Sequence, residues 1–412
     1  MENFTTLQVH ERPVVVMDNG SGYTKMGFHG NALPNFVIPT AISFGGSERR
    51  AAGPVSCSDD SQVYIGDEAL SQHDHSVHYP IRHGVVKCWD HMERFWQQSI
   101  HRYLRVNSED HNFILTEPPM NPPENRETAA EIMFETFNVP GLCIGVQAVL
   151  SLYAAFAVAE KGSKTHRSSL TGCVIDIGDG CTHIIPVSDG YVIASAIKSV
   201  PIAGRDVTSF VQQLMRDRKE PVPVDMSMDV ARRIKETLCY TASDVVKEFA
   251  KHDAHPDKHS RVYTCADPRT GAEHACNVRH EAFLAPEVFF RPDFISDEYT
   301  TPLPQLVDRV IQSCPIDTRR ALYGNIVLSG GSTMFKDFGR RLQRDLQKAV
   351  AARQPLGGRP VDVRVAGAQR FGVWFGGSVL GMMPHFGSMC CSRAEYQERG
   401  FRASVANNDG AA

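Results

Sequence analysis

The sequence predicts an α/β protein built from two related halves, and three observations support this prediction. Two apolar runs each end in the pattern Asp-x-Gly-x-Gly, at residues 18–22 and again at 176–180, which is 158 positions further along the chain. Segments with helical periodicity alternate with short strand-like segments after each run. The chain of 412 residues is long enough for roughly two to four compact units with buried cores.

Composition excludes several classes of protein. Apolar residues make up 42% and charged residues 22% of the chain, which is typical of a soluble globular protein. The formal net charge of −4 gives no reason to expect a nucleic-acid partner. The 11 cysteines follow no disulfide framework and contain no CxxC pair, and the polar residues 1–13 do not resemble a secretory signal. Reduced thiols and a cytoplasmic location are therefore expected.

Residues 141–159 carry no charge and nearly reach the length of a membrane span. They include the polar residues Gln147, Ser151 and Tyr153, and the chain has no second segment of this kind. We therefore predict a buried core helix here and no membrane insertion.

The first Asp-x-Gly-x-Gly pattern predicts a β-hairpin. Residues 14–18 are an apolar run that ends at Asp18, and Asn19-Gly20 is a strong turn signal because a tight turn needs positive φ. Residues 23–28 alternate between polar and apolar side chains and form the predicted return strand.

The second pattern predicts the same structure. Residues 173–177 form the apolar strand, Gly178 and Gly180 allow a tight turn, and residues 182–187 form the return strand.

Two such hairpins favour a phosphate clamp that the two turns share. A glycine-rich turn exposes backbone N–H groups to phosphate oxygens, Ser21 adds a hydroxyl donor, and Lys25 adds a positive charge. The carboxylates of Asp18, Asp176 and Asp179 suit Mg²⁺ held through water molecules. The alternative is a pair of unrelated β-turns, since one Asp-x-Gly-x-Gly is a weak pattern. Neither a GxxxxGK[ST] loop nor a complete dinucleotide fingerprint is present.

The rest of the chain is predicted to mix helices and strands. Helices are expected at 124–137, 147–158, 229–249 and 335–352, and a strand is expected at 325–329. Because that strand runs into Gly330 and Gly331 ahead of a helix, we predict a second phosphate or nucleoside cradle there. Residues 45–62, 252–278 and 402–412 are weakly patterned and read as loops.

Two groups of histidines have no companion cysteines at ligand spacing, and we do not predict a structural metal at either. They are His73, His75, His78 and His83, and His252, His255 and His259.

Five segments resemble actin in sequence and in order along the chain. They are DNGSG (18–22), QAVLSLY (147–153), DIGDG (176–180), KETLCY (235–240) and LSGGSTM (328–334). Other segments depart from actin and resemble a branch of actin-related proteins. These are YPIRHGV (79–85), LTEPP (115–119), NRE (125–127), EIMFE (131–135), FNVPG (137–141), PIAGRD (201–206), CPID (314–317) and FGRRLQRD (338–345). The chain is thus similar to the actin family from about residue 14 to residue 400.

This resemblance implies the fold shared by actin, Hsp70 and sugar kinases, with two lobes of duplicated origin, four subdomains and a central nucleotide cleft. The first lobe would span 14–152, with 40–75 as its small outer subdomain, and about 369–401 would complete it. The second lobe would span 153–368, with about 202–285 as its outer subdomain. Residues 1–13 and 402–412 would be tails.

The resemblance also assigns site residues for ATP and Mg²⁺. Gln147 and His183 match the pair that orders the attacking water, and Asp18 and Asp176 match residues around the metal, through water. The residues matched to nucleotide contacts are Gly20, Ser21, Gly22, Tyr23, Lys25, Gly178, Asp179, Gly180, Gly204, Arg232, Lys235, Glu236, Gly330, Gly331, Ser332, Met334, Phe335 and Arg370. ATP hydrolysis is expected to be slow at most, because related proteins use ATP mainly to set the angle between lobes.

The implied function is structural. The matching branch supplies an ATP-binding subunit that pairs with actin-related protein 2 in a seven-subunit complex, templates the barbed end of a filament, and starts a branch. Its partners would be the other subunits, actin filaments, actin monomers and nucleation-promoting activators in the cytoplasmic actin cytoskeleton. Tyr153, Leu380 and Met383 match the apolar groove that faces the filament, although a core role suits them equally.

Four alternatives stay open at this level. A divergent filament-forming actin is the nearest, but residues 45–62 do not resemble the loop with which actin grips its neighbour. An actin-related subunit of a nuclear chromatin-remodelling complex fits the motifs less well. A sugar kinase would need a catalytic Asp that we do not find, and a chaperone ATPase would need a further substrate-binding module. Residues 354–360 and 402–412 depart from the family pattern.

Overall fold

A computed structural model describes residues 12–45, 62–72, 75–158, 170–267, 271–353, 361–366 and 370–408, without the side chains of 402–408. The chain divides into two compact units. Unit 1 comprises Met1–Leu170, Asp189–Val192 and Phe371–Ala412, and unit 2 comprises Thr171–Ser188 and Ile193–Arg370. Within the described residues, no helix is both long and apolar enough to cross a membrane.

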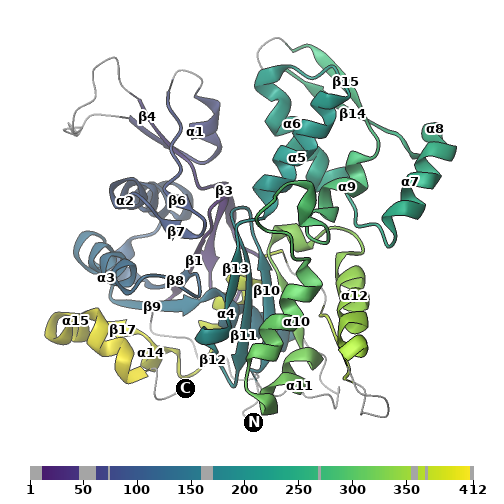
Figure 1. Ribbon diagram of the computed structural model, residues 1–412. Coiled ribbons are helices and arrows are strands. Elements are labelled where there is room, and N and C mark those ends of the chain that lie inside the picture. Colours follow the sequence, from purple (N-terminus) through teal and green to yellow (C-terminus); the bar gives the residue numbers. More distant parts are fainter. Residues whose placement is uncertain are drawn as a thin grey trace. The chain divides into compact units, whose positions relative to one another are not determined.

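Unit 1 is organised around a six-stranded sheet with the order β17-β9-β8-β1-β2-β3 (Figure 1). The strands β1, β8 and β9 are parallel, whereas β2, β3 and β17 pair antiparallel with their neighbours. The bounds of the six strands are β1 Val14–Asn19, β2 Tyr23–Phe28, β3 Phe36–Pro39, β8 Asn112–Glu117, β9 Gly141–Val146 and β17 Cys391–Ser392.

Strand β1 is buried on both faces, which explains its unbroken apolar run. Alternate side chains of a strand point to opposite faces of the sheet. Accordingly Val15 and Met17 belong to one hydrophobic cluster, and Val14 and Val16 belong to another. The first cluster is completed by helices α2 (Trp89–Gln98) and α3 (Pro123–Glu131), and the second by α4 (Gln147–Val158) and α13 (Gly372–Leu380).

The helices α4 and α13 pack closely because Gly376 has no side chain. A Cβ atom at this position would lie 1.8 Å from the carbonyl oxygen of Leu150, which is backbone and has no room to move away. The close approach carries Trp374 into the core, where its indole N–H donates to the Val16 carbonyl over 3.1 Å. These contacts fix α4, and with it Gln147, against the sheet.

The other elements of unit 1 are short. The two-stranded sheets are β4 (Ile42–Gly45) with β5 (Gln62–Ile65), and β6 (Ile81–Arg82) with β7 (Val85–Val86). The helices are α1 (Asp67–Ser71), α14 (Phe386–Met389) and α15 (Arg393–Asn408), and π-helical turns Ser99–Leu104 and Ile132–Thr136 extend α2 and α3.

Unit 2 contains a second sheet in which β11 (Thr182–Ser188), β10 (Gly172–Ile177) and β16 (Ile326–Ser329) are neighbours in that order. The strand β13 (Lys198–Val200) pairs with β11. The short strand β12 (Tyr191–Val192), which follows β11 in the chain, is counted with unit 1. Strands β10 and β16 run parallel, whereas β10 and β11 form an antiparallel hairpin.

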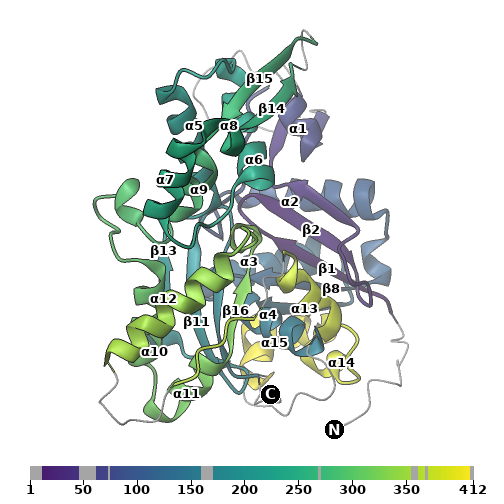
Figure 2. The same cartoon turned by 90° about the vertical axis from the view of Figure 1, so that its right-hand side faces the viewer.

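Eight helices of unit 2 fall within the described residues. Among them α10 and α12 lie side by side (Figure 2). Their bounds are α5 Gly204–Asp217, α6 Ser227–Leu238, α7 Val245–Ala254, α8 Pro256–His259, α9 Glu281–Glu287, α10 Leu303–Ser313, α11 Ile316–Gly324 and α12 Phe338–Arg353. A separate hairpin consists of β14 (Arg261–Ala266) and β15 (Glu273–Val278).

The structure confirms the α/β prediction and both hairpins. The helix expected at 124–137 is present as α3 with its π-helical turn, and the helix expected at 147–158 is present as α4. The segment 141–159 is not one helix, however, because its first six residues form strand β9. Residues 142–146 pair with β8 from Phe113 to Glu117, a partner that local periodicity does not reveal.

The single helix expected at 229–249 is also wrong, because α6 ends at Leu238 and α7 begins at Val245. Tyr240 N–H donates to the Ala282 carbonyl over 2.8 Å, and Thr241 N–H donates to the Lys336 carbonyl over 2.9 Å. Those bonds take the backbone away from helical pairing. The Asp244 carboxylate then caps α7 by accepting from the Lys247 N–H over 3.2 Å.

Two further expectations need correction. Helix α12 begins at Phe338 rather than at residue 335. Asp337 has a left-handed φ of 64°, and the Lys336 carbonyl accepts from the Thr241 N–H, so neither residue continues the helix. The glycines at 330–331 therefore do not lie at the N-terminus of that helix. Residues 252–278 are not a loop, because they include the end of α7, helix α8 and both strands of the β14–β15 hairpin. Residues 402–408 are not a loop either, because they form the end of α15. Residues 46–61 of the weakly patterned stretch 45–62 lie outside the described residues, as do the segment 354–360 that departs from the family pattern, residues 1–11 and residues 409–412.

Candidate nucleotide-binding loops

The turn between β1 and β2 is tight, but neither Asn19 nor Gly20 has the positive φ that the sequence predicted. Asn19 still belongs to β1 and residues 20–22 make the connection, so a two-residue turn at Asn19-Gly20 does not form. The Gly20 N–H donates to the Tyr23 carbonyl over 3.1 Å, and the Gly20 carbonyl accepts from the Thr40 hydroxyl over 2.8 Å. A Cβ atom on Gly20 would lie 2.9 Å from the Tyr23 oxygen and 3.3 Å from Lys25 Nζ. The position therefore requires glycine.

Donor groups of this turn are available for an anion. Within the described part of the chain, the N–H groups of Ser21 and Gly22 have no acceptor. Ser21 Oγ accepts from the Gly84 N–H over 2.8 Å, which leaves the hydroxyl hydrogen to donate elsewhere. The neighbouring Asn19 side chain is held by the Trp96 indole N–H over 3.2 Å. Successive backbone donors of this kind suit phosphate oxygens.

Asp18 lies at the centre of a polar cluster at one edge of the sheet in unit 1. The strands β1, β8 and β9 are parallel, so their carboxyl ends meet there and bring Asp18, Thr116 and Gln147 together. Asp18 Oδ2 pairs with Lys25 Nζ at 2.9 Å, and Oδ1 accepts from the Thr116 hydroxyl over 2.7 Å. Gln147 Nε2 lies 3.4 Å from the same Oδ1.

This cluster suits a hydrated magnesium ion. Asp18 is 3% exposed, and both of its oxygens already accept hydrogen bonds from side chains. A carboxylate in that state orders metal-bound water better than it serves as a direct ligand, and Mg²⁺ keeps much of its water. Asp18 and Gln147 would hold such water molecules, and the ion would supply charge neutralisation for phosphate oxygens.

The predicted loops of unit 2 are joined through one carbonyl group. The Gly178 oxygen accepts from the Gly204 N–H over 3.0 Å and from the Ser332 hydroxyl over 2.9 Å. Arg205 adds a backbone bond to the Asp179 carbonyl at 2.9 Å and an ion pair with the Asp179 carboxylate at 3.1 Å. The structure thus brings the 178–180 turn, the start of α5 and the 330–333 loop together.

Lys235 joins the same group from helix α6. It is 8% exposed and donates from Nζ to the Gly204 carbonyl over 2.9 Å. Burial lowers the pKa of this ammonium, and the negative charges of Asp179 and Glu236 oppose that shift. Glu236 itself is exposed on α6, and Arg232 is ion-paired with Asp229 one turn earlier.

The third loop depends on Gly330, which has a left-handed φ of 89°. Its Cβ would lie 2.3 Å from the Ile177 oxygen, because the parallel strands β10 and β16 end side by side. Beyond it, residues Gly331–Thr333 form a 3-10 turn. Met334 is 48% exposed, Phe335 packs against the core, and Arg370 is exposed.

His183 faces its neighbours across two strands of unit 2. The register places it opposite Asp176 on β10 and Ser199 on β13. Its Nδ1 atom lies 2.7 Å from the Ser199 hydroxyl. Burial lowers the pKa of the imidazole, and the negative charge of Asp176 opposes this shift.

Sequence reasoning missed three residues that support these groups. Thr116 orients Asp18, Ser199 contacts the imidazole of His183, and Asp206 caps α5 by accepting from the Ala203 N–H over 2.8 Å. Thr116 and Asp206 lie within the segments 115–119 and 201–206 that carry the family resemblance, which could have drawn attention to them. Ser199 has no such signal, because only strand pairing places it beside His183.

The predicted groove residues share one apolar cluster in unit 1. Leu380 is buried in it, and Tyr153 and Met383 are partly buried against it. The structure therefore groups the three residues, as either a groove or a core role would require.

The histidines at 252–259 are built into unit 2. The His252 ring stacks on His259 with a centroid separation of 4.9 Å, and its Nε2 lies 3.2 Å from the Tyr240 hydroxyl. Across the part of the chain that the structure describes, which leaves out His73, no group of three or more His, Cys, Asp or Glu side chains is arranged to hold a metal ion.

Comparison with known proteins identifies the class. The family model of actin matches residues 9–407, and the chain therefore belongs to the actin family. Membership confirms the predicted fold class, since the mixed α/β sheets and hairpins described above are consistent with the actin-like ATPase fold.

The particular relatives are proteins named actin-related protein 3. The chain is 51% identical to that of Oryza sativa subsp. japonica, in an alignment covering 94% of this chain and 96% of the relative. It is 51% identical to that of Caenorhabditis elegans, covering 96% and 97%. It is 50% identical to that of Dictyostelium discoideum, covering 94% and 95%. These relatives confirm the similarity to a branch of actin-related proteins that the motifs predicted.

Proposed function

We propose that this chain is the ATP-binding actin-related subunit of a complex that nucleates actin branches. It would pair with actin-related protein 2, and together they would template the barbed end of a new filament on the side of an existing one. The observation that carries this proposal is the identity of about 50% to proteins named actin-related protein 3 over nearly the whole chain. A cytoplasmic location in the actin cytoskeleton follows from the same proposal.

The nucleotide would be ATP with Mg²⁺. Support comes from the N–H groups of Ser21 and Gly22, from the charge of Lys25, and from the way Gly178, Gly204, Ser332 and Lys235 are joined in unit 2. The predicted metal residues Asp18 and Asp176, and the predicted water-ordering residues Gln147 and His183, belong to this proposal as well.

Saturating Mg-ATP is expected to raise the melting temperature of the purified chain. A ligand at 100 times its dissociation constant contributes about 2.7 kcal/mol to the native state. Ser21→Ala should weaken ATP binding about tenfold or more, because hydrogen bonds to charged groups contribute about 1.5–3 kcal/mol. Ser71→Ala is the control, since that exposed hydroxyl donates to the Asp67 carbonyl within α1. A folded sample whose melting temperature ignores Mg-ATP would refute the site.

Ser199→Ala is expected to slow phosphate release about twofold to tenfold while ATP affinity changes little. The hydroxyl bonds to His183 Nδ1, and the partner of one ring nitrogen determines which nitrogen carries the proton. Loss of one such bond costs about 0.5–1.5 kcal/mol. Phosphate release should be measured in single-turnover assays from pH 6 to 9. If ATP affinity falls instead, Ser199 has a structural role in binding.

The assembly experiment tests the proposal as a whole. The tagged chain, purified from its own cells, is expected to bring down a second actin-related chain in equal amount within one large complex. That fraction should start branches from added actin when an activator is present, whereas the isolated chain should stay monomeric under conditions that polymerise actin. The isolated chain is expected not to form filaments because propagation needs the same head-to-tail interface at every step. Residues 45–62 do not resemble the loop with which actin grips its neighbour at that interface.

The rival functions predict different results in the same experiment. Homopolymers of the purified chain that sediment would favour a divergent filament-forming actin. Recovery with nuclear remodelling subunits alone would favour a chromatin-remodelling role.

A further inference from the structure

The edge strand β17 places two cysteines of unit 1 opposite each other. Cys391 pairs with Leu142 and Ser392 pairs with Gly141 in an antiparallel ladder, and the Arg393 N–H donates to the Pro140 carbonyl over 3.0 Å. Cys390 directly precedes β17 and has an extended backbone with φ −85° and ψ 135°, and we extend the register by this one residue. It sets Cys390 opposite Cys143 on β9.

The hydrogen-bonding pattern defines the kind of pair. Arg393 and Pro140 form a hydrogen-bonded position, and such positions alternate with non-hydrogen-bonded ones along an antiparallel ladder. The pair Cys390 and Cys143 lies three positions along the ladder from the pair Arg393 and Pro140. Because the two types of position alternate, an odd number of steps places the cysteines at a non-hydrogen-bonded position. Cα atoms at such positions are about 4.5 Å apart, which lies within the range of about 4.4–6.8 Å that a disulfide spans.

The two thiols face each other within one cluster. Cys143 is 7% exposed and belongs to the buried cluster against which Cys390 is packed, as are Tyr153 and Met389. The pKa of Cys390 is raised, first by its hydrogen bond with the Cys143 thiol and then by burial. Both cysteines are in the free thiol form. The adjacent Cys391 belongs to the cluster on the opposite face of the sheet.

We propose that Cys143 and Cys390 are a site of reversible oxidation, where a small-molecule disulfide of the glutathione type converts the facing thiols into an intramolecular disulfide. Within the described residues, a second thiol pair on neighbouring strands is placed less well. Cys265 and Cys276 lie on one hairpin but are diagonal rather than opposite, because Tyr263 is the residue that pairs with Cys276. The inference is independent of the proposed nucleotide and assembly functions.

The reaction is a balanced exchange of two thiols for one disulfide. Cys390 is the more exposed thiol, so its thiolate attacks the oxidant, breaks the oxidant's S–S bond and releases one thiolate. The Cys143 thiolate then attacks the sulfur of Cys390 in the mixed disulfide and releases the second. The two protons lost by the protein are taken up as the oxidant becomes two reduced thiols. Because the pKa of Cys390 is raised, oxidation should be slow at neutral pH and faster in alkaline buffer.

Oxidation would join β17 covalently to β9. The strand β17 contributes only two residues to the sheet and leads directly into α15. A bond between Cys390 and Cys143 would hold this junction, and the groove residue Tyr153 beside it, against the sheet. Since the side chains already touch, the disulfide should form without a change of fold, and the oxidised chain should melt at a higher temperature than the reduced chain.

The experiment uses the whole reduced chain with oxidised glutathione as the probe. After incubation at pH 7 and pH 8.5, remaining thiols are alkylated and the protein is digested without reductant. We expect a peptide pair joined between Cys143 and Cys390, with the mass of two hydrogens lost, formed at least about tenfold faster at the higher pH as the thiolate fraction rises. Dithiothreitol should reverse both the cross-link and the gain in melting temperature.

Matched variants separate this pair from other thiols. Cys390→Ser should abolish the cross-link, whereas Cys391→Ser should retain it because Cys391 faces the other side of the sheet. The proposal is overturned if native protein forms a Cys390–Cys391 disulfide instead. It is also overturned if only glutathione adducts accumulate, or if the cross-link appears only in urea.

Discussion

Replacing Gly330 by alanine is expected to destabilise unit 2 severely. The new Cβ atom would lie 2.3 Å from the oxygen and 2.6 Å from the carbonyl carbon of Ile177, both of which are backbone atoms of a central strand. The backbone at Gly330, with φ 89° and ψ 154°, is a conformation that essentially only glycine adopts. Strain and overpacking together should cost about 2–6 kcal/mol.

The adjacent Gly331 provides the matched control. A Cβ atom there meets nothing within 4 Å and its φ is not left-handed, so Gly331→Ala should change the free energy of unfolding by less than about 1 kcal/mol. The three tryptophans, Trp89, Trp96 and Trp374, lie in unit 1 and do not report on unit 2. Circular dichroism in urea, together with hydrogen exchange of the β10 and β16 peptides, should be used instead. Equal effects of the two substitutions would contradict this account of the loop.

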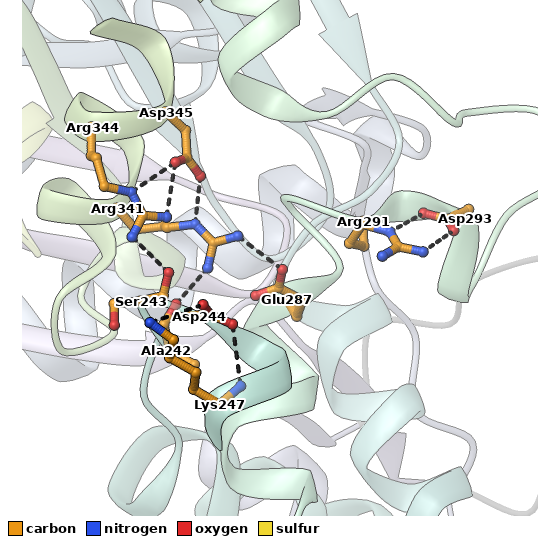
Figure 3. Close-up of polar contacts among 10 residues, drawn as sticks. All are labelled: Ala242, Ser243, Asp244, Lys247, Glu287, Arg291, Asp293, Arg341, Arg344 and Asp345. Atoms are coloured by element: carbon orange, nitrogen blue, oxygen red, sulfur yellow. Dashed lines mark hydrogen bonds and ion pairs between the residues drawn. The ribbon is translucent and has the colours of Figure 1, made fainter. Parts of the chain in front are cut away.

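Loss of the Arg341 side chain is expected to have the second largest effect. Figure 3 shows its guanidinium between Glu287, Asp345 and the Ala242 carbonyl. The distances are 3.1 Å to Glu287 Oε1, and 2.5 Å both to Asp345 Oδ2 and to the Ala242 oxygen. The same guanidinium lies 4.8 Å from the centroid of the Phe290 ring. It therefore ties α12 to α9 and to the connection between α6 and α7.

Arg341→Met should lower the free energy of unfolding by about 3–5 kcal/mol, because it leaves a buried carboxylate without its partner. Glu287 is 2% exposed, so solvent cannot replace the guanidinium. Arg340→Met is the control: its side chain is 89% exposed in its pair with Asp337, and such surface pairs contribute about 0–1 kcal/mol. Urea unfolding followed by circular dichroism measures both variants, and a difference below about 1 kcal/mol between them would contradict the prediction.

The pH dependence of this cluster has a definite sign. Burial raises the pKa of Glu287 to about 7, and Arg341 opposes that shift. The pKa of this carboxyl group is therefore higher in the folded state than in the unfolded state. Its contribution to stability is fully present below the unfolded pKa, and it is lost as the pH rises from there through the folded pKa of about 7. Glu287→Gln should therefore remove a fall in stability between pH 5 and pH 8, and it should recover part of the loss in Arg341→Met.

The sequence by itself determined the two hairpins, the α/β class and the family. The glycine-rich connection at 20–22 and strands such as 14–18 depend on neighbouring residues, so their place in the chain can be read locally, although the predicted positive φ at Asn19-Gly20 is absent. The glycine loops and Asp18 could be found because they belong to short patterns of neighbouring residues. The family motifs then extended the set of candidate nucleotide-binding residues, and the roles of these residues stay predictions.

Only the tertiary structure decided the features that depend on distant partners. Residues 141–146 form a strand because β8 pairs with them, and the chain leaves helix α6 at Leu238 because Ala282 and Lys336 bind the next backbone groups. Thr116 orients Asp18, and Ser199 contacts His183, because neighbouring strands bring them together. Cys143 and Cys390 are 247 positions apart and meet through the register of β9 and β17. A hydrogen bond or a strand register formed across such distances leaves no periodicity in the sequence, since neither partner constrains the residues beside it.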